Sequence, residues 1–499
     1  MRAPLTQSER ASTALSSFYA TSLEQILTRH LSDDPLARAL SLFHEVATSV
    51  PAYARFLAGH QVAPGSVTSL EAFGRLPTPT KDSYYRQHPL PDLCRHGQLE
   101  RSDFAAVSSG STGEPAIWPR FVSDELGTAE RFEQVLGDAF RARERRTLGV
   151  VCFALGSWVG GMYTTAACRH VAAKGYPLTL VTPGNNPVEI LRVVRALAPH
   201  FEQTVLFGYP PFLKDVLDAG RADGLDWASC RLRLVTAGEV FSETWRALVA
   251  ERAGMRDPTC DSASLYGTAD GGVLANETPL SISLRRFFAE RPAAARELFG
   301  EPRLPTLCQY DPLHRYFEVD AGDLLFTGDG GAPLVRYRIL DRGGVIPYDT
   351  MLAFARDQGF SPVPLAGGAL RRDMPFVYVF GRTGFAISYY GANVYPENIA
   401  PALEGAALSA HVSGKFVLEL EQTTDENVGL RLNVELLPGR EPGAELARAL
   451  GRAARSELEL QNSEFKSYVP ENRRDPRVVL MPAGEPEYFP KGVKHRYTR

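Results

Sequence analysis

Short apolar strands alternate with amphipathic helices along the middle of this chain, and this alternation is the feature that most restricts its fold. Three strand–helix pairs show it: 178–181 with 187–197, 203–207 with 211–219, and 232–236 with 242–253. Strands that are separated by helices usually pair in parallel, because each helix returns the chain to the same end of the sheet. The pattern predicts an α/β fold with a parallel or mixed sheet that is covered by helices.

The segments on either side of this region show different patterns. The first hundred residues are expected to be helical, with apolar residues at helical spacing over 21–30 and 36–46 and a helix start at 80–82. Segment 321–339 is expected to form antiparallel strands that are interrupted at 328–333. These flanking segments therefore add helices and antiparallel strands to the central α/β pattern.

A small separate unit is expected after a boundary near 381–384. It should contain strands at 416–421, 430–437 and 478–481 and a helix at 444–460. A chain of 499 residues is also too long for one compact core. We expect a large multi-layer α/β N-terminal body and a small α+β C-terminal domain, with residues 1–100 as the helical part of the body, 101–382 as its ligand-binding part and 383–499 as a mobile domain.

Composition excludes several classes of protein. The formal net charge of −4 argues against a nucleic acid or an anionic membrane as partner. The apolar stretch 148–168 contains four glycines and indicates a buried strand and a packed helix rather than a membrane span. No apolar segment follows the charges of the first ten residues, so no secretory signal is expected.

The cysteines indicate a reducing compartment. Six of them are scattered along the chain without a C-x-x-C pair, so we expect no disulfides and a cytoplasmic location. Cys308 and His314, which are separated by five residues, are a candidate metal pair, although no second pair accompanies them.

A Ser/Gly-rich loop is the first candidate functional motif. It comprises Ser108, Ser109, Gly110, Ser111, Thr112 and Gly113. Hydroxyl donors and glycine amides can surround phosphate oxygens, but no Gly-Lys-Ser/Thr closes the loop as in a Walker A motif. The segment 116–119 that follows indicates a short strand, so the loop is expected at a hairpin tip. Taken alone, such a run is more often a solvated turn.

Four further segments follow this loop in a fixed order. They are 236–239 (Thr-Ala-Gly-Glu), 264–270 (Ser-Leu-Tyr-Gly-Thr-Ala-Asp), 322–327 with 333–341, and 381–383 with 391–399. Together with the loop, their order and spacing resemble the acyl-adenylate-forming superfamily, and within it the phenylacetate–CoA ligase-like branch. The segments at 49–53 and 76–81 are similar to the N-terminal signature of that branch. The resemblance covers nearly the whole chain.

The resemblance implies an AMP-forming acid ligase that uses ATP and Mg²⁺. Such an enzyme converts a carboxylic acid to an acyl-AMP, releases pyrophosphate, and passes the acyl group to an acceptor, usually coenzyme A. The Ser/Gly loop would hold the outer phosphates of ATP. Gly238 and Glu239 would line the adenine slot, and Tyr266 would offer a ring for stacking there. Ser264 and Gly267 belong to the same implied nucleotide site.

Four residues carry the chemistry that the resemblance implies. Asp341 matches the carboxylate that accepts hydrogen bonds from both ribose hydroxyls, and Arg382 matches the arginine that contacts the ribose or a phosphate. Asp270 stands where the family usually has a Mg²⁺-binding Glu, and a carboxylate one methylene shorter can still bind a hard cation. Lys494 matches the adenylation lysine of the terminal loop, with Lys491 as the alternative.

Two departures from the family pattern leave the acceptor open. Ala269 replaces a Thr that usually touches the α-phosphate, and Gly384 stands in place of a charged hinge residue. The acceptor is therefore expected to be coenzyme A or, alternatively, an amine or a carrier-protein thiol. A third reading is a non-catalytic relative that binds nucleotide. The sequence leaves the oligomeric state open, and a homodimer is one alternative because dimers are common in the resembling branch.

The acyl pocket is expected near residues 158–163. Trp158, Gly160, Gly161 and Met162 lie where the resembling branch builds it. Apolar lining with glycines admits a flat or slender acid, and the rings of Phe153 and Tyr163 would suit an aryl group. An aromatic acid is thus one candidate substrate.

Overall fold

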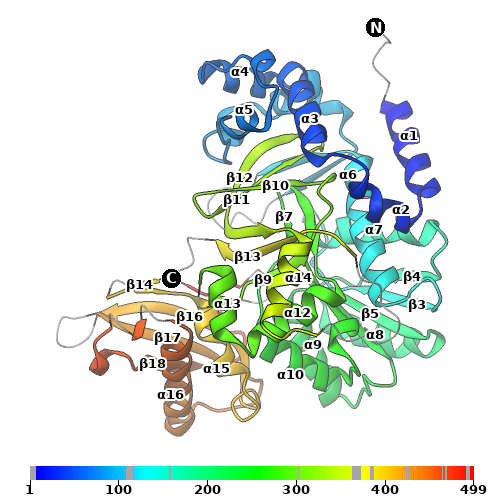
Figure 1. Cartoon of the computed structure of the whole chain (residues 1–499). Helices are drawn as coiled ribbons and strands as arrows, with labels where there is room; N and C mark the ends of the chain where they lie inside the picture. Colours follow the sequence, from blue (N-terminus) through cyan, green and yellow to red (C-terminus); the bar gives the residue numbers. More distant parts are fainter. Residues whose placement is uncertain are drawn as a thin grey trace.

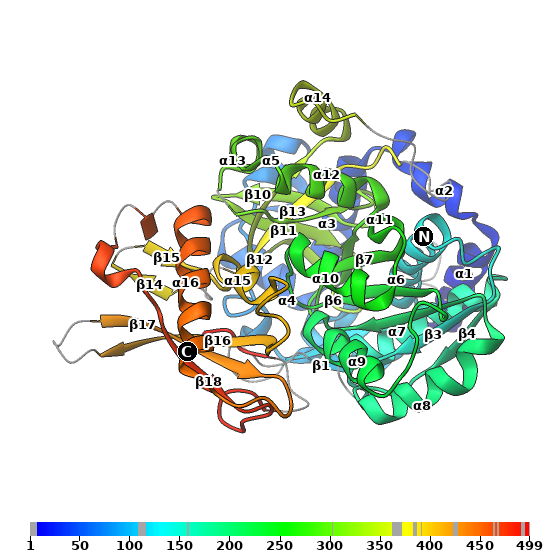
Figure 2. The same ribbon diagram turned by 90° about the horizontal axis from the view of Figure 1, so that it is seen from below.

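The chain folds into a large body and a smaller part that contains its C-terminal residues (Figure 1). The structure is a computed structural model, and it describes residues 7–107, 116–156, 159–301, 303–361, 372–382, 387–390, 392–422, 428–462, 465–466, 469–490 and 495–498. The view from below places the smaller part beside the body rather than on top of it (Figure 2).

An 11-stranded sheet runs through the body in the order β10-β11-β12-β13-β9-β8-β7-β6-β5-β3-β4. One half is parallel and consists of β3 (Thr147–Val151), β4 (Leu178–Val181), β5 (Gln203–Gly208), β6 (Leu232–Ala237) and β7 (Ser262–Thr268). The other half is antiparallel and consists of β8 (Gly272–Asn276), β9 (Thr306–Gln309), β10 (Tyr316–Asp320), β11 (Asp323–Gly328), β12 (Leu334–Ile346) and β13 (Phe376–Arg382). The expected mixed sheet is confirmed.

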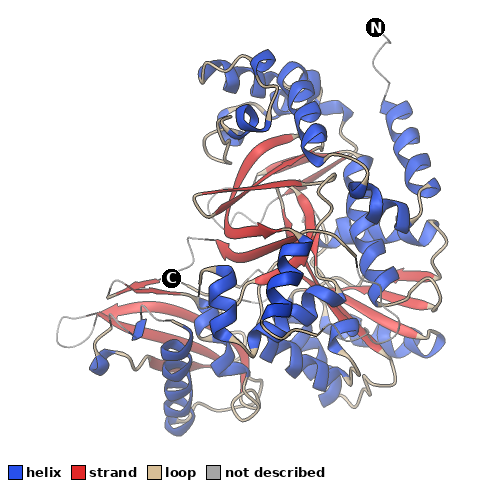
Figure 3. Ribbon diagram, viewed as in Figure 1, coloured by secondary structure: helices blue, strands red, loops and turns tan. Residues whose placement is uncertain are grey.

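Helices cover both faces of the parallel half (Figure 3). Side chains alternate across a strand, so Val205 and Phe207 of β5 pack with α6 (Val122–Gln134) and α7 (Val159–Ala173), while Leu206 packs with the helices on the opposite face. Those helices are α8 (Pro187–Leu197), α9 (Pro210–Ala222) and α10 (Glu243–Ala253). The body is therefore a three-layer α/β/α structure.

The N-terminal helices are α1 (Gln7–Ala20), α2 (Leu23–Thr28), α3 (Pro35–Ser49), α4 (Pro51–Gly59) and α5 (Leu70–Gly74). Of these helices, α3, α4 and α5 pack over the antiparallel half, while α1 and α2 contact α6. Buried residues of α3 and α4 share one hydrophobic core with strands β10, β11 and β12. The body contains four further helices: α11 (Pro258–Asp261), α12 (Pro279–Ala289), α13 (Pro292–Phe299) and α14 (Tyr348–Asp357). The first hundred residues thus belong to the body and do not form a core of their own.

One expected helix start is wrong. Thr80 and Ser83 do exchange the hydrogen bonds of a helix cap, with the Ser83 amide donating to the Thr80 hydroxyl at 2.9 Å. However, the chain continues through turns into a 3₁₀ helix at Tyr85–Gln87 and then reaches Pro89. Proline lacks an amide donor and disfavours a helical residue before it, so no α-helix can extend from this cap.

The smaller part has its own sheets and core. Its elements are β14 (Ile387–Tyr389), β15 (Ala392–Val394), α15 (Ala400–Glu404), β16 (Val412–Gln422), β17 (Val428–Leu436), α16 (Ala444–Gln461) and β18 (Arg477–Met481). β14 pairs with β15, and β16, β17 and β18 form a separate three-stranded sheet. Along the chain, β13 is the last strand of the large sheet, and it ends at Arg382. This residue lies within the predicted boundary near 381–384. The β1–β2 hairpin, made of β1 (Phe104–Val107) and β2 (Ile117–Arg120), forms the remaining sheet, in the body.

Candidate functional site

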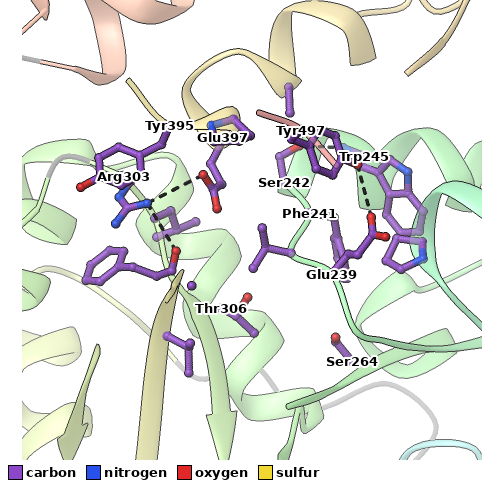
Figure 4. Close-up of a pocket in the computed structure, with 18 of the residues that line it drawn as sticks. Glu239, Phe241, Ser242, Trp245, Ser264, Arg303, Thr306, Tyr395, Glu397 and Tyr497 are labelled. Atoms are coloured by element: carbon purple, nitrogen blue, oxygen red, sulfur yellow. Dashed lines mark hydrogen bonds and ion pairs between the residues drawn. The ribbon is translucent and has the colours of Figure 1, made fainter. Parts of the chain in front are cut away.

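A cavity of about 570 Å³ lies where the body and the smaller part meet. Its lining from the body includes residues that end or follow β6, β7 and β13, and Asp341 from the middle of β12. Its lining from the smaller part includes Tyr395, Glu397, α15 residues and the tail residues His495 and Tyr497 (Figure 4). Ligands of open α/β sheets bind beyond the carboxyl ends of the strands, and β6 and β7 present those ends to this cavity.

Tyr266 and Asp341 form one polar pair in the cavity wall. The Tyr266 hydroxyl donates a hydrogen bond to Asp341 Oδ2 at 2.8 Å. Both residues are buried, at 9% and 6% relative exposure. The backbone of Asp341 lies opposite that of Arg382 in the β12–β13 ladder. The pair therefore fixes a carboxylate in the cavity wall, beside the last residue of β13.

Asp270 is held just as firmly in the turn between β7 and β8. The Tyr337 hydroxyl donates to Asp270 Oδ2 at 2.7 Å. Arg120 donates through Nη2 to the carbonyl oxygens of Ala269 and Asp270, the latter at 3.1 Å. Arg315 donates through Nη2 to the Gly271 carbonyl oxygen at 2.9 Å. Two guanidinium groups thus bind three successive carbonyls and fix the turn that carries this carboxylate.

Arg120 also connects this turn to the β1–β2 hairpin. Arg120 is the last residue of β2, and Val107 at the end of β1 lies opposite Ile117 at the start of β2. The hairpin that the sequence predicted around the Ser/Gly-rich segment is therefore present in its two strands. Ser108 to Gly113 themselves lie outside the described residues.

Gly238 and Glu239 follow β6 and border the same cavity. Gly238 has a φ of +87°, and a Cβ at this position would lie 2.7 Å from a ring carbon of Tyr209. A side chain there would be both strained and overlapping, so the position requires glycine. The carboxylate of Glu239 accepts a hydrogen bond from the Tyr497 hydroxyl at 3.3 Å.

The structure brings most of the predicted site residues together. Gly238, Glu239, Ser264, Tyr266, Gly267, Asp270 and Asp341 all line the one cavity. Lys494 and Lys491 lie outside the described residues, and so does the side chain of Arg382, whose backbone ends β13. Lys81 also lines the cavity. The sequence indicated this residue only as part of the N-terminal segment 76–81.

The residues expected to form the acyl pocket lie elsewhere, as far as the structure describes them. Phe153 packs edge-on against Tyr209, with ring centroids 4.9 Å apart, and Tyr163 stacks near Phe104 at 6.5 Å. Met162 is exposed, and none of the described residues from this group lines the cavity. Trp158 is outside the described residues. Phe153 and Tyr209 do follow β3 and β5, where the strand order reverses.

Arg303 and Glu397 form a contact across the cavity that the sequence did not indicate. Arg303 Nη1 lies 3.8 Å from Glu397 Oε2 and donates to the Phe380 carbonyl oxygen at 3.3 Å. Its guanidinium also lies 3.7 Å from the centroid of the Tyr395 ring (Figure 4). Burial raises the pKa of Glu397, and Arg303 opposes that shift. The one sequence signal for this pair is that Glu397 lies in segment 391–399, which is among the segments that carry the resemblance.

Two other buried groups border the cavity close to the junction. Burial raises the pKa of Glu404 to about 7, while a hydrogen bond from the Ser242 hydroxyl acts in the opposite direction. Burial lowers the pKa of Lys214, and Asp218, whose carboxylate lies 3.1 Å from its Nζ, opposes that shift. The junction therefore contains ionisable groups whose charge depends on how closely the two parts pack.

Cys308 and His314 do not mark a metal site in the part of the chain that the structure describes, where no three His, Cys, Asp or Glu side chains converge to hold an ion. Cys308 lies in β9 and is buried. Burial, with Arg315 and Arg131 nearby, keeps the pKa of His314 well below its ordinary value.

None of the described helices is long and apolar enough to cross a bilayer.

Similarity to known proteins is visible in structure. We found no family model and no curated protein that matches the chain. Crystal structures of 2-hydroxyisobutyryl-CoA ligase do match. The structure of its postadenylation state with R3-HIB-AMP has a TM-score of 0.66 at 15% identity and covers 96% of this chain and 93% of that one. Its thioesterification state with 2-HIB-AMP and CoA gives a TM-score of 0.53 over the same coverage.

The two scores differ although the same shares of both chains are compared. A second postadenylation structure, with 2-HIB-AMP, gives 0.62 over 93% of this chain. The overall similarity is therefore higher to the two postadenylation structures than to the thioesterification structure. The predicted resemblance is confirmed at the level of the fold, because the chain has the fold of 2-hydroxyisobutyryl-CoA ligase.

Proposed function

We propose that this chain is an AMP-forming acid ligase that activates a carboxylic acid with ATP. The observation that carries the proposal is the convergence of Glu239, Tyr266, Asp270 and Asp341 on one cavity in this fold. These residues come from three separate sequence segments. Each segment resembles a part of the nucleotide site in the acyl-adenylate-forming superfamily.

The first step is the attack of a carboxylate oxygen on the α-phosphorus of ATP, with cleavage of the bond to the pyrophosphate oxygen. Negative charge grows on the phosphoryl oxygens, so positioning and electrostatic stabilisation dominate catalysis. Lys494 would supply a point charge at the α-phosphate, and Arg382 would contact the ribose or a phosphate. Ser108 to Gly113 would hold the outer phosphates.

The fixed carboxylates have distinct roles in this proposal. Asp341, oriented by Tyr266, would accept hydrogen bonds from the ribose hydroxyls. Asp270 would contact the Mg²⁺ that accompanies ATP, because Mg²⁺ in nucleotide sites is typically held by one or two carboxylates together with phosphates and water. Hydrogen bonds from the Tyr337 hydroxyl and from two arginines hold the Asp270 turn in place, which supports this role.

The second step would transfer the acyl group from AMP to a thiol, with coenzyme A as the acceptor. The thiol sulfur attacks the acyl carbon, and AMP leaves with the bonding electrons. The proposal also includes membership of the phenylacetate–CoA ligase-like branch, a cytoplasmic location and a homodimeric state. A domain boundary near 381–384 would let residues 383–499 move between the two steps.

One observation favours an amine as the acceptor instead. Glu239, Glu397 and Glu404 all border the cavity where the two parts meet. Coenzyme A carries several phosphates, whereas an amine in its ammonium form is attracted by carboxylates. An amide-forming ligase would perform the same first step and differ only in the second.

Acid-dependent exchange between ATP and labelled pyrophosphate tests the first step. We expect at least one member of a panel of aliphatic, 2-hydroxy and aromatic acids to support exchange. Failure of every acid would contradict the ligase assignment. Consumption of coenzyme A by the exchanging enzyme then separates the acceptors, because exchange without thioester formation points to an amine or a carrier thiol.

A further inference from the structure

We propose that Tyr497 is a positioning residue that holds the smaller part of the molecule against the body for the acid-activating step, through its hydrogen bond to Glu239. The inference rests on the proposed function. It adds a role for a residue that none of the sequence motifs indicated.

The tail residues 495–498 are fixed to the smaller part. The amide of Leu418, in β16, donates to the Tyr497 carbonyl oxygen at 2.8 Å, and Thr498 forms a parallel bridge with the same residue. His495 Nε2 lies 2.8 Å from the Phe416 carbonyl oxygen. The Tyr497 ring packs 5.1 Å from Phe416 and 4.4 Å from His495, centroid to centroid. Tyr497 therefore moves with β16.

The Tyr497 hydroxyl leaves this unit and reaches the body. It donates to Glu239 Oε2 at 3.3 Å, a contact between residues 258 positions apart, and both side chains border the cavity (Figure 4). Burial raises the pKa of the Tyr497 hydroxyl, and Glu239 and Glu404 raise it further, so the group stays a donor at neutral pH. A hydrogen bond to a charged acceptor is stronger than a neutral one.

The position of Tyr497 links this contact to the first step. His495 lines the cavity and is joined by a peptide bond to Lys494, which lies outside the described residues. Whatever fixes residues 495–498 therefore limits where Lys494 can be.

Tyr497→Phe removes the hydroxyl and keeps the ring contacts. Tyr488→Phe is a matched control, because the Tyr488 hydroxyl also donates to a glutamate at 3.3 Å, but to Glu419 within the smaller part. Both variants would be assayed for acid-dependent pyrophosphate exchange and for acyl transfer from synthetic acyl-AMP. The double variant Tyr497→Phe/Glu239→Gln completes a mutant cycle.

We expect Tyr497→Phe to lower kcat of exchange about tenfold, the effect of one lost hydrogen bond to a charged group. Acyl transfer from preformed acyl-AMP should stay within twofold of wild type, and Tyr488→Phe should resemble wild type in both assays. In the Glu239→Gln background the tyrosine substitution should have a smaller effect. Equal exchange rates in the two tyrosine variants, or equal losses in both steps, would overturn the proposal.

A distance measurement tests the contact without relying on the enzyme assignment. Arg221 in α9 and Arg448 in α16 are exposed, and all six native cysteines are buried, so cysteines introduced at these two positions can carry spin labels. We expect one main distance in the wild-type and Tyr488→Phe backgrounds and an additional or broader population in Tyr497→Phe. Unchanged distances would overturn the positioning role even if no acid supports exchange.

Discussion

Asp341 combines burial with a fixed orientation, since the Tyr266 hydroxyl holds one of its carboxylate oxygens at 2.8 Å. Asp341→Asn keeps the size of the side chain but removes the charge and one acceptor. If this carboxylate binds the ribose, the variant should raise KM for ATP about tenfold to a hundredfold, the range for hydrogen bonds to a charged group.

Pyrophosphate exchange at varied ATP concentrations measures this effect. Asp357→Asn, an exposed charge change at the end of α14, is the control and should leave KM unchanged. An unchanged KM in Asp341→Asn would remove Asp341 from the nucleotide site.

Gly238 offers a second test at the scale of one residue. Gly238→Ala combines a positive φ with a Cβ only 2.7 Å from the Tyr209 ring, whereas Gly224→Ala has a similar φ of +75° and nothing within 4 Å. We expect Gly224→Ala to cost about 1 kcal/mol of unfolding free energy and Gly238→Ala distinctly more. Thermal or urea unfolding measures the difference. Equal losses would show that Tyr209 moves aside freely.

At the scale of elements, α15 of the smaller part meets the N-terminus of α10 in the body. Ser242 caps α10 by accepting from the Trp245 amide at 3.0 Å, and its hydroxyl donates to Glu404 at the end of α15. Arg285 and Lys214 also face Glu404 from the body, and Glu457 faces it from α16. Burial outweighs these groups and raises the pKa of Glu404 from 4.5 to about 7.

This shift predicts how stability depends on pH. Between pH 4.5 and 7 the folded chain binds the Glu404 proton more tightly than the unfolded chain does. The contribution to the unfolding free energy is therefore fully present below pH 4.5 and is lost as pH rises to about 7. The loss is on the order of 3 kcal/mol.

Glu404→Gln should remove this dependence. The difference in melting temperature between wild type and variant, measured from pH 5 to pH 8, should shift steadily in favour of the variant. A difference that is constant with pH would show that Glu404 does not titrate in this range.

Local signals predicted the elements better than they predicted the site. Both β4 and α8 have the predicted bounds. The start of α8 is set locally by Pro187 and by the Asn186 side chain, which accepts a hydrogen bond from the Glu189 amide at 3.2 Å. The contacts of Arg120 with residue 270 and of Tyr497 with Glu239 span 150 and 258 positions. Such contacts depend on the order of the strands and on how the two parts pack, neither of which a local pattern contains.

At the scale of the whole molecule, an ion pair joins the two parts. Lys415 Nζ in β16 lies 2.6 Å from Asp215 Oδ2 in α9 and 3.6 Å from Glu435 Oε2. Lys415→Gln should weaken the arrangement and lower the exchange rate about twofold to fivefold, as expected for a partly exposed pair.

Ionic strength distinguishes this from a local effect. Added salt should slow exchange in the wild type and have less effect on Lys415→Gln, because salt screens the same pair. Arg477→Gln is the control, since Arg477 pairs with Glu421 at 2.9 Å inside the smaller part. If salt changes the exchange rates of Arg477→Gln and Lys415→Gln equally, the Lys415–Asp215 ion pair does not affect how the two parts pack.

The cavity wall combines residues from hydrophobic cores of the body, such as Tyr266 and Leu265, with Leu403 from the separate core of the smaller part. Local unfolding of either core opens the cavity, even while the other remains intact. The capacity to bind a ligand should therefore vanish at the first unfolding transition, when the less stable core unfolds. A ligand that bridges both walls would couple the two cores and make them unfold together.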